Sequence, residues 1–207
     1  MNRRDFVVCS ASTAAGIGVA AIGLRAHGDA SLQGPRRPLP YKVIFDTRYR
    51  ASRAFGDQAA KLGLALRPIA GDVTSLWFRE LQPLWARCEG AVVGMTTCAS
   101  LLCLEQLARD HWMRVVARVE HRRRSDGMLC HRLFLPRATL RSANLALAQR
   151  EHWAEGMISP LVARLANKHS GRAVESVVLT ADRSREDPGI TLVSWVIATR
   201  PSRGEPI

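Results

Sequence analysis

Short aliphatic segments alternate with amphipathic segments three times in the first half of this chain. Aliphatic runs at 41–46, 64–69 and 90–97 are each followed by apolar residues at helical spacing, and a fourth run covers 113–121. Two parallel strands need a long crossover between them, which is usually a helix. The alternation therefore predicts an α/β fold in which a parallel sheet has right-handed crossovers and helices on both faces.

The second half of the chain departs from this alternation. The polar turn Ser125-Asp126-Gly127 joins the fourth run to another at 128–135, which is typical of a β-hairpin and makes the expected sheet mixed. The whole pattern resembles a three-layer Rossmann-like sandwich with a mostly parallel sheet and an antiparallel hairpin. We expect one α/β domain over 41–200 and a frayed tail over 201–207. The other expected elements are helices at 139–151 and 152–169 and strands at 175–181 and 190–199.

The N-terminus has the composition of a targeting segment. Asn2-Arg3-Arg4-Asp5-Phe6 precedes a mild apolar run, 7–24, that is rich in Ala and Gly. This stretch resembles a twin-arginine translocation signal peptide, whose pattern is Ser/Thr-Arg-Arg-x-Phe-Leu-Lys. Arg3, Arg4 and Phe6 match that pattern, whereas its first position and its last two differ here. We expect a signal peptide over 1–30 and a Pro-rich linker over 31–40.

The resemblance implies that the twin-arginine export machinery carries the protein, already folded, to the periplasm. Proteins on this pathway often acquire a cofactor or a co-exported partner in the cytoplasm, although no motif identifies a cofactor here. If the leader is retained, an apolar run of about 18 residues is just long enough to anchor the chain in a membrane.

Basic residues outnumber acidic ones, which gives a formal net charge of +12, and only three of the basic residues are lysines. Such a surface can attract an anionic small ligand or associate weakly with anionic lipid, and it can equally be a solvated face. Nucleic acid does not suit an exported protein. The densest basic cluster, Arg122-Arg123-Arg124, also lacks interleaved aromatic residues that would stack on bases.

Four cysteines follow the leader, at positions 88, 98, 103 and 130. The periplasm permits disulfides, but Cys98 and Cys103 lie five positions apart on one expected helix and face different directions. A bridge between Cys88 and Cys130 stays open. Because the chain would fold in a reducing compartment, we expect four buried free thiols.

The candidate binding residues lie where two expected strands end. In open parallel sheets, ligands bind beyond the carboxyl ends of the strands. The loop after 41–46 offers a carboxylate, a hydroxyl and a guanidinium. The loop after 90–97 offers hydroxyls and a thiol beside the free amides of a helix N-terminus, which favour an anion or a thiolate. The candidates are Asp46, Thr47, Arg48, Thr96, Thr97, Cys98 and Ser100.

Each of these residues also has a purely structural interpretation. Asp46 and Thr97 are suitable helix caps, and Cys98 is small enough to pack beneath its helix. The aromatic residues Trp77, Phe78 and Trp85 recur at helical spacing, which usually indicates core; a protruding Trp77-Phe78 pair would instead form a docking surface or one wall of a ligand cleft.

Histidines recur at 111, 121 and 131, and His121 and His131 flank the expected hairpin. Their spacing matches no metal-binding motif, and adjacent strand residues point to opposite faces, so we expect no metal site but solvated hairpin histidines. Motifs for dinucleotides, phosphate loops, serine hydrolases and covalent haem are also missing from the sequence.

Three functions remain. The first is an exported, non-catalytic small-ligand-binding or accessory protein that acts beside a larger envelope enzyme or transporter. The second is an enzyme with Cys98 as its nucleophile and His121, His131 or Asp46 as its base. The third is a basic structural protein that associates with the envelope through its arginines.

Overall fold

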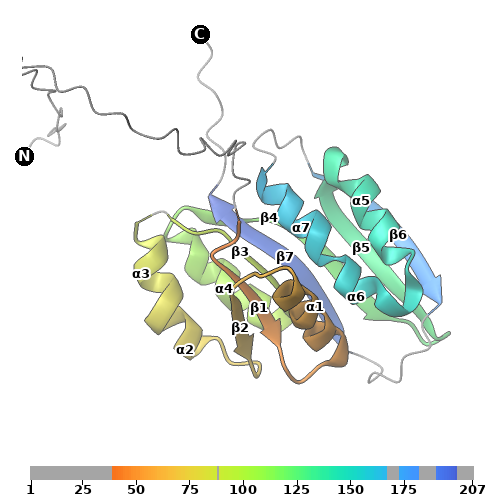
Figure 1. The fold of residues 1–207 in the computed structure, drawn as a ribbon, viewed down its shortest axis with the longest axis horizontal. Coiled ribbons are helices and arrows are strands. Elements are labelled where there is room, and N and C mark those ends of the chain that lie inside the picture. The colour runs from red at the N-terminus through yellow and green to blue at the C-terminus, as the bar shows by residue number, and fades with distance from the viewer. Residues whose placement is uncertain (1–38, 88, 167–172, 182–189, 200–207) are drawn as a thin grey trace, which may run out of the picture. The chain divides into compact units, whose positions relative to one another are not determined.

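The computed structural model describes residues 39–87, 89–166, 173–181 and 190–199, so the expected leader, most of the linker and the tail lie outside the described residues. The described strands form one seven-stranded sheet (Figure 1). Its strands are β1 (Lys42–Asp46), β2 (Leu66–Ile69), β3 (Val92–Thr97), β4 (Met113–Arg123), β5 (Met128–Pro136), β6 (Ala173–Ala181) and β7 (Thr191–Thr199).

The connecting helices are mostly short, and two stretches of the chain are broken into several helical pieces. They are α1 (Arg50–Lys61), α2 (Thr74–Leu76), the π-helical turn η1 (Trp77–Leu81), α3 (Gln82–Trp85), α4 (Cys98–Arg109), α5 (Arg137–Leu147), the 3₁₀ turn η2 (Arg150–His152), α6 (Trp153–Gly156) and α7 (Ile158–Ala166).

The strand order is β2-β1-β3-β7-β4-β5-β6. Parallel pairing joins β2 to β1 and β1 to β3, and every other neighbouring pair is antiparallel. The α/β class and the β4–β5 hairpin are thus confirmed. The expectation of a mostly parallel sheet holds only for the first three strands, because β7 inserts between β3 and β4 and separates two strands that the alternation alone would make neighbours.

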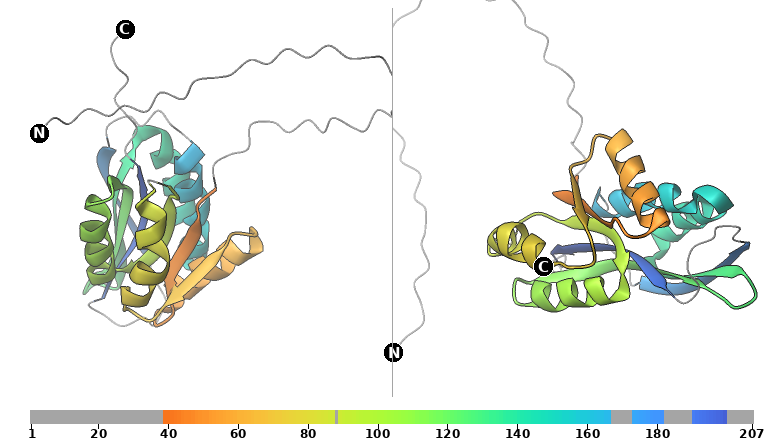
Figure 2. Two further views of the ribbon diagram at one scale, coloured as in Figure 1. Left: turned by 90° about the vertical axis from the view of Figure 1, so that its left-hand side faces the viewer. Right: turned by 90° about the horizontal axis from the view of Figure 1, so that it is seen from below.

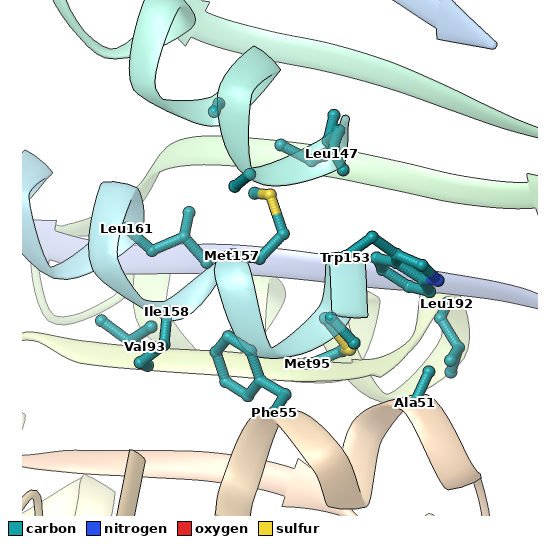
Figure 3. Packing of buried hydrophobic residues seen from close by; sticks show 14 of the residues in the cluster. Ala51, Phe55, Val93, Met95, Leu147, Trp153, Met157, Ile158, Leu161 and Leu192 are labelled. Atoms are coloured by element: carbon teal, nitrogen blue, oxygen red, sulfur yellow. The ribbon is translucent and has the colours of Figure 1, made fainter. Parts of the chain in front are cut away.

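Helices pack against both faces of the sheet and bury two hydrophobic clusters (Figure 2). On one face, α1, α5, α6 and α7 bury Phe55, Met157 and Leu161 against strand residues such as Val93 and Met95 (Figure 3). On the other face, α2, η1, α3 and α4 cover β1, β3, β7 and the start of β4, and no residue of β5 or β6 belongs to that cluster. This second layer therefore leaves part of the antiparallel half uncovered.

The parallel and antiparallel halves meet where β3 pairs with β7. Gly94 lies opposite Trp195, whose indole packs over the strand. A Cβ at Gly94 would lie 2.8 Å from the carbonyl oxygen of Ile44 and closer still to the indole ring. The indole Nε1 donates to Thr96 Oγ1 at 3.0 Å, so glycine at position 94 allows a large side chain to hydrogen-bond inside the junction.

The segment between β2 and β3 forms a broken helix. Just before α2, Asp72 accepts a hydrogen bond from the Thr74 backbone N–H at 2.8 Å. Hydrogen bonding to the Thr74 side chain, and secondarily to its backbone N–H, lowers the pKa of Asp72. The π turn η1 lies just before Gln82-Pro83. Proline has no N–H to donate and its ring crowds the preceding turn, so the wider turn relieves that conflict. Among the described residues, no helix is long and apolar enough to cross a bilayer.

Candidate functional site

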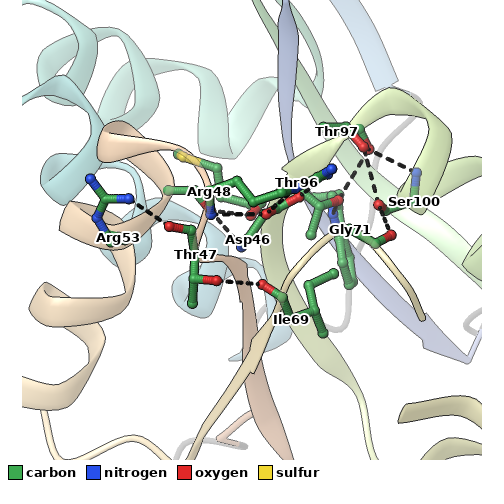
Figure 4. A network of polar contacts seen from close by, with 12 residues as sticks. Asp46, Thr47, Arg48, Arg53, Ile69, Gly71, Thr96, Thr97 and Ser100 are labelled. Atoms are coloured by element: carbon green, nitrogen blue, oxygen red, sulfur yellow. Dashed lines mark hydrogen bonds and ion pairs between the residues drawn. The ribbon is translucent and has the colours of Figure 1, made fainter. Parts of the chain in front are cut away.

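The loops that follow β1, β2 and β3 lie side by side, where the carboxyl ends of these three parallel strands meet (Figure 4). Asp46, the last residue of β1, is fully buried. Its carboxylate accepts from the Arg48 backbone N–H at 3.1 Å and from the Arg48 guanidinium at 3.0 and 2.7 Å. This hydrogen bond raises the pKa of Arg48. Asp46 does not cap α1, since no side chain caps that helix; instead it fixes the loop.

Two further side chains tie this loop to its neighbours. Ser52 is fully buried and accepts from the Asp46 backbone N–H at 2.7 Å, while its own hydroxyl donates to the Met95 carbonyl at 2.5 Å. Thr47 donates through Oγ1 to the Ile69 carbonyl at 3.0 Å. The strand ends are therefore held rigidly, which is the condition for a preorganised binding surface.

Gly71, in the loop after β2, supports the Arg48 guanidinium. It adopts a φ of 90°, and a Cβ there would overlap that guanidinium. Its carbonyl accepts from Ser100 Oγ at 2.9 Å, which links the loop to the first turn of α4. Neither Gly71 nor Ser52 is among the seven candidate residues predicted from the sequence. The same strand-end rule, applied to the loop after β2, would have found Gly71.

The residues after β3 mostly bond to one another. Thr97 Oγ1 accepts from the Ser100 backbone N–H at 3.3 Å and lies 3.1 Å from Ser100 Oγ, so Thr97 caps α4 as its structural interpretation predicts. Thr96 is buried and accepts from Trp195. The seven candidate residues thus lie together at the carboxyl ends of β1 and β3. Most of their polar atoms already bond to other groups of the protein.

Cys98 begins α4 and is exposed rather than packed beneath the helix. Its Sγ accepts from Arg118 Nη2 at 3.6 Å. The proposed bases are placed elsewhere: the Asp46 carboxylate is paired with Arg48, and the ring nitrogens of His121 and His131 bond to other groups. In these contacts none of the three proposed bases is hydrogen-bonded to the Cys98 thiol.

A groove of about 620 Å³ opens beside these loops, between η1 and α4. Its floor includes Trp77, which is buried, and its rim includes Phe78 and Leu102, which are exposed. Gly71 and Ser100 also line it, so the groove shares two residues with the hydrogen-bonded loops. Trp77 therefore belongs to the core and also forms part of a cleft, whereas Phe78 projects outward.

The hairpin histidines are buried, and the expectation of solvated rings is wrong. His121 and His131 pair directly across β4 and β5, and their Nδ1 atoms are 2.7 Å apart. The Nε2 of His121 lies 2.9 Å from Ser194 Oγ in β7, and the Nε2 of His131 lies 3.0 Å from Thr180 Oγ1 in β6. The prediction is wrong because it rested on the nearness of both histidines to an exposed turn. Side chains alternate between the two faces of a strand, and in this register both rings point to the face that the helices cover.

Ser194, His121, His131 and Thr180 form one chain of hydrogen bonds, and this chain requires the two rings to be in opposite tautomers. At 2.7 Å, one Nδ1 donates and the other accepts, so one Nε2 accepts from a hydroxyl and the other donates to one. Trp153 of α6 lies over both rings, with ring centroids 4.4 Å from His121 and 5.1 Å from His131. Burial, and secondarily repulsion from His131, lowers the pKa of His121 well below its ordinary value of 6.5.

The structure gives no metal cluster in its described part: no group of three or more His, Cys, Asp or Glu side chains is close enough to hold an ion. Cys98, Cys103 and Cys130 are free thiols. The first two are exposed and the third is half-buried, so the expectation of buried thiols is wrong for these positions, and Cys88 lies outside the described residues. The candidate export residues Arg3, Arg4 and Phe6 lie outside them as well.

Comparison of the chain with protein-family models, with curated proteins and with solved structures finds no match.

Proposed function

We propose that this chain is an exported, non-catalytic protein of the periplasm that binds a small ligand and acts beside a larger envelope enzyme or transporter. The resemblance of Arg3, Arg4 and Phe6 to a twin-arginine signal supports export, and a chain that still reached the periplasm after Arg3→Lys and Arg4→Lys substitution would argue against that pathway. The observation that supports ligand binding is the groove between η1 and α4.

The groove has the size and lining of a ligand site. Small-molecule pockets commonly enclose about 300–1,000 Å³ and combine apolar walls with a few polar groups at one end. Here the walls are Trp77, Phe78, Leu102 and Leu107, and the polar groups lie where Gly71 and Ser100 meet the strand ends. A ligand with an apolar body fits such walls.

The polar end of the groove favours an anionic group. Arg48 is half-exposed, and its guanidinium contacts Gly71 on the groove's border while two of its nitrogens bond Asp46. Arg48 Nη1 is not used by either of those bonds. The groove lining also includes the Asp72 carboxylate. The ligand class we propose is therefore an apolar molecule with one carboxylate, sulfonate or phosphate, which must bind at Arg48 and away from Asp72.

We also propose that the α/β fold is, more specifically, a three-layer Rossmann-like sandwich. It is supported by helices on both faces of the sheet and by a groove near the carboxyl ends of the parallel strands β1, β2 and β3.

Two fluorescent probes with a similar apolar body test the proposal. 8-Anilinonaphthalene-1-sulfonate carries an anion, and N-phenyl-1-naphthylamine does not. We expect saturable binding of one molecule of each per chain. Phe78→Asp, which places a charge on the groove wall, should weaken both probes at least tenfold. Leu145→Asp is the matched control, since Leu145 is equally exposed (64%) but lies on α5.

The anionic end is tested by the ratio of the two affinities. We expect the sulfonate to bind about tenfold more tightly, which corresponds to about 1.4 kcal/mol for one charge-assisted hydrogen bond. The double variant Asp46→Asn, Arg48→Ala should remove that ratio and leave the uncharged probe unaffected. Binding that is not saturable, or that Phe78→Asp leaves unchanged, would refute the groove as the site.

A further inference from the structure

The two outer strands of the sheet differ in how well they resist pairing with another strand. An outer strand presents unpaired backbone N–H and C=O groups, and proteins usually protect such edges with short strands, proline or charged side chains. β2 is protected in this way: it has four residues and contains Pro68. β6, at the right-hand edge in Figure 1, has nine residues with the sequence AVESVVLTA.

β6 has few of the usual protective features. It contains no proline and no lysine or arginine, and its one charged residue, Glu175, is paired with Arg132 at 2.6 Å. Val177 and Leu179 are 56% and 51% exposed, on the sheet face that α2, η1, α3 and α4 leave uncovered. β6 bonds β5 along its full length on one side, and no described strand bonds its other side. Such an edge is a ready template for a further strand.

We propose that β6 pairs antiparallel with β6 of a second copy of this chain, which joins the two sheets into one across a two-fold axis. The sequence of β6 is self-complementary when the axis passes through Val178. In that register Val177 lies opposite Leu179 of the second copy, and Ser176 lies opposite Thr180. Aliphatic residues then face aliphatic residues on the uncovered side.

Charge disfavours one competing register. An axis through Glu175 would place two carboxylates directly opposite each other, which is unfavourable. With the axis at Val178, Glu175 lies opposite Ala181 of the second copy and keeps Arg132 as its partner. The strand itself adds no positive charge to the contact, although the whole chain is strongly basic.

The contrast between the two edges also limits the assembly to a dimer. Head-to-tail pairing of β6 with β2 would continue indefinitely and form a filament, but Pro68 and the short length of β2 oppose it. Pairing of β6 with itself uses the same surface on both copies and closes after two chains. The groove residues lie on the β2–α2 loop, α2, η1 and α4, so this contact leaves the groove open in both copies.

Sedimentation velocity and amide hydrogen exchange of the full chain test the proposal. We expect a dimer at micromolar concentration. The variant Val177→Lys, Leu179→Lys should raise the dissociation constant at least a hundredfold and leave the circular dichroism spectrum unchanged. The matched control is Leu62→Lys, Leu145→Lys, which adds the same charge at leucines that are 50% and 64% exposed outside β6; it should remain dimeric.

Amide exchange locates the contact. In the concentrated wild-type protein the amides of β6 should be protected, and dilution below the dissociation constant should increase exchange in β6 and not in β2. A wild-type chain that stays monomeric overturns the proposal. So does a dimer that persists in the Val177→Lys, Leu179→Lys variant, or whose dilution leaves exchange in β6 unchanged.

Discussion

The parallel and antiparallel halves of the sheet use polar side chains in opposite ways. In the parallel half, β2-β1-β3, the polar residues lie at the strand ends, and Arg48 and Ser100 reach the border of an open groove. In the antiparallel half, β4-β5-β6, His121 and His131 lie within the strands and are enclosed beneath Trp153. Accessible polar groups can bind a ligand, whereas enclosed ones must satisfy one another. On the proposal made above, the exposed polar groups of the first half bind the small ligand, whereas the buried polar groups of the second half stabilise the fold.

The largest effect is expected where the two halves join. Gly94→Ala should destabilise the fold by about 3 kcal/mol, because the new methyl group would overlap the Trp195 indole and crowd the Ile44 carbonyl. Urea denaturation followed by tryptophan fluorescence measures the change. In a Trp195→Leu background the same substitution should cost much less. Equal costs in both backgrounds would mean that the indole is not what excludes a side chain at position 94.

A smaller difference is expected between two ion pairs, one in each half. Arg48→Ala should cost about 2 kcal/mol, because it leaves the fully buried Asp46 carboxylate without its guanidinium partner. Arg132→Ala should leave the denaturation midpoint unchanged, since Arg132 and Glu175 are each half-exposed and water replaces the lost contact. If the two substitutions destabilised the protein equally, the buried Asp46 carboxylate would depend on its arginine no more than the half-exposed Glu175 does.

The smallest effect is a pH dependence that belongs to the antiparallel half. His121 has a lowered pKa in the folded protein, so the unfolded chain takes up a proton near pH 6.5 while the folded chain does not. Stability is therefore retained above that pH and falls as the pH decreases below it. The loss between pH 7.5 and 5.5 should be about 1 kcal/mol, measured by denaturation at each pH.

Two substitutions separate this effect from general surface titration. His121→Gln removes the buried imidazole and should flatten the pH dependence, although it lowers stability at every pH. His152→Gln is the control, because His152 is largely exposed, and it should leave the slope unchanged. A steep slope that survives His121→Gln would place the titrating group elsewhere.

Local patterns in the sequence predict well which segments of the parallel half are strands and helices, and that its strands run parallel. The aliphatic runs before Asp46 and Thr97 are strands, and Thr97 caps α4. The rule that ligand-binding residues follow the carboxyl ends of parallel strands also predicts that the seven candidate residues lie close together. What the sequence does not reveal is how the candidate residues bond to one another, since the Asp46–Arg48 pair depends on loop geometry and on Gly71 in a third loop.

The antiparallel half is less predictable because its arrangement depends on contacts between distant residues. Nothing near residues 191–199 indicates that β7 lies between β3 and β4. The burial of His121 and His131 likewise depends on Trp153 and on hydroxyls from Ser194 and Thr180, which lie far along the chain. Residue spacing can suggest that the two rings are neighbours, but not that a helix covers them.

The position of β7 has a consequence for the order in which the protein is made. β7 follows every other described strand in the chain, yet it occupies the middle of the sheet. During synthesis, β1 to β6 emerge first, and until β7 arrives the facing edges of β3 and β4 have no strand between them. Domain formation on the ribosome cannot then proceed strand by strand from the N-terminus. The central strand of the sheet can therefore be added only after all the other described strands have been made, which makes closure of the sheet a late event in synthesis.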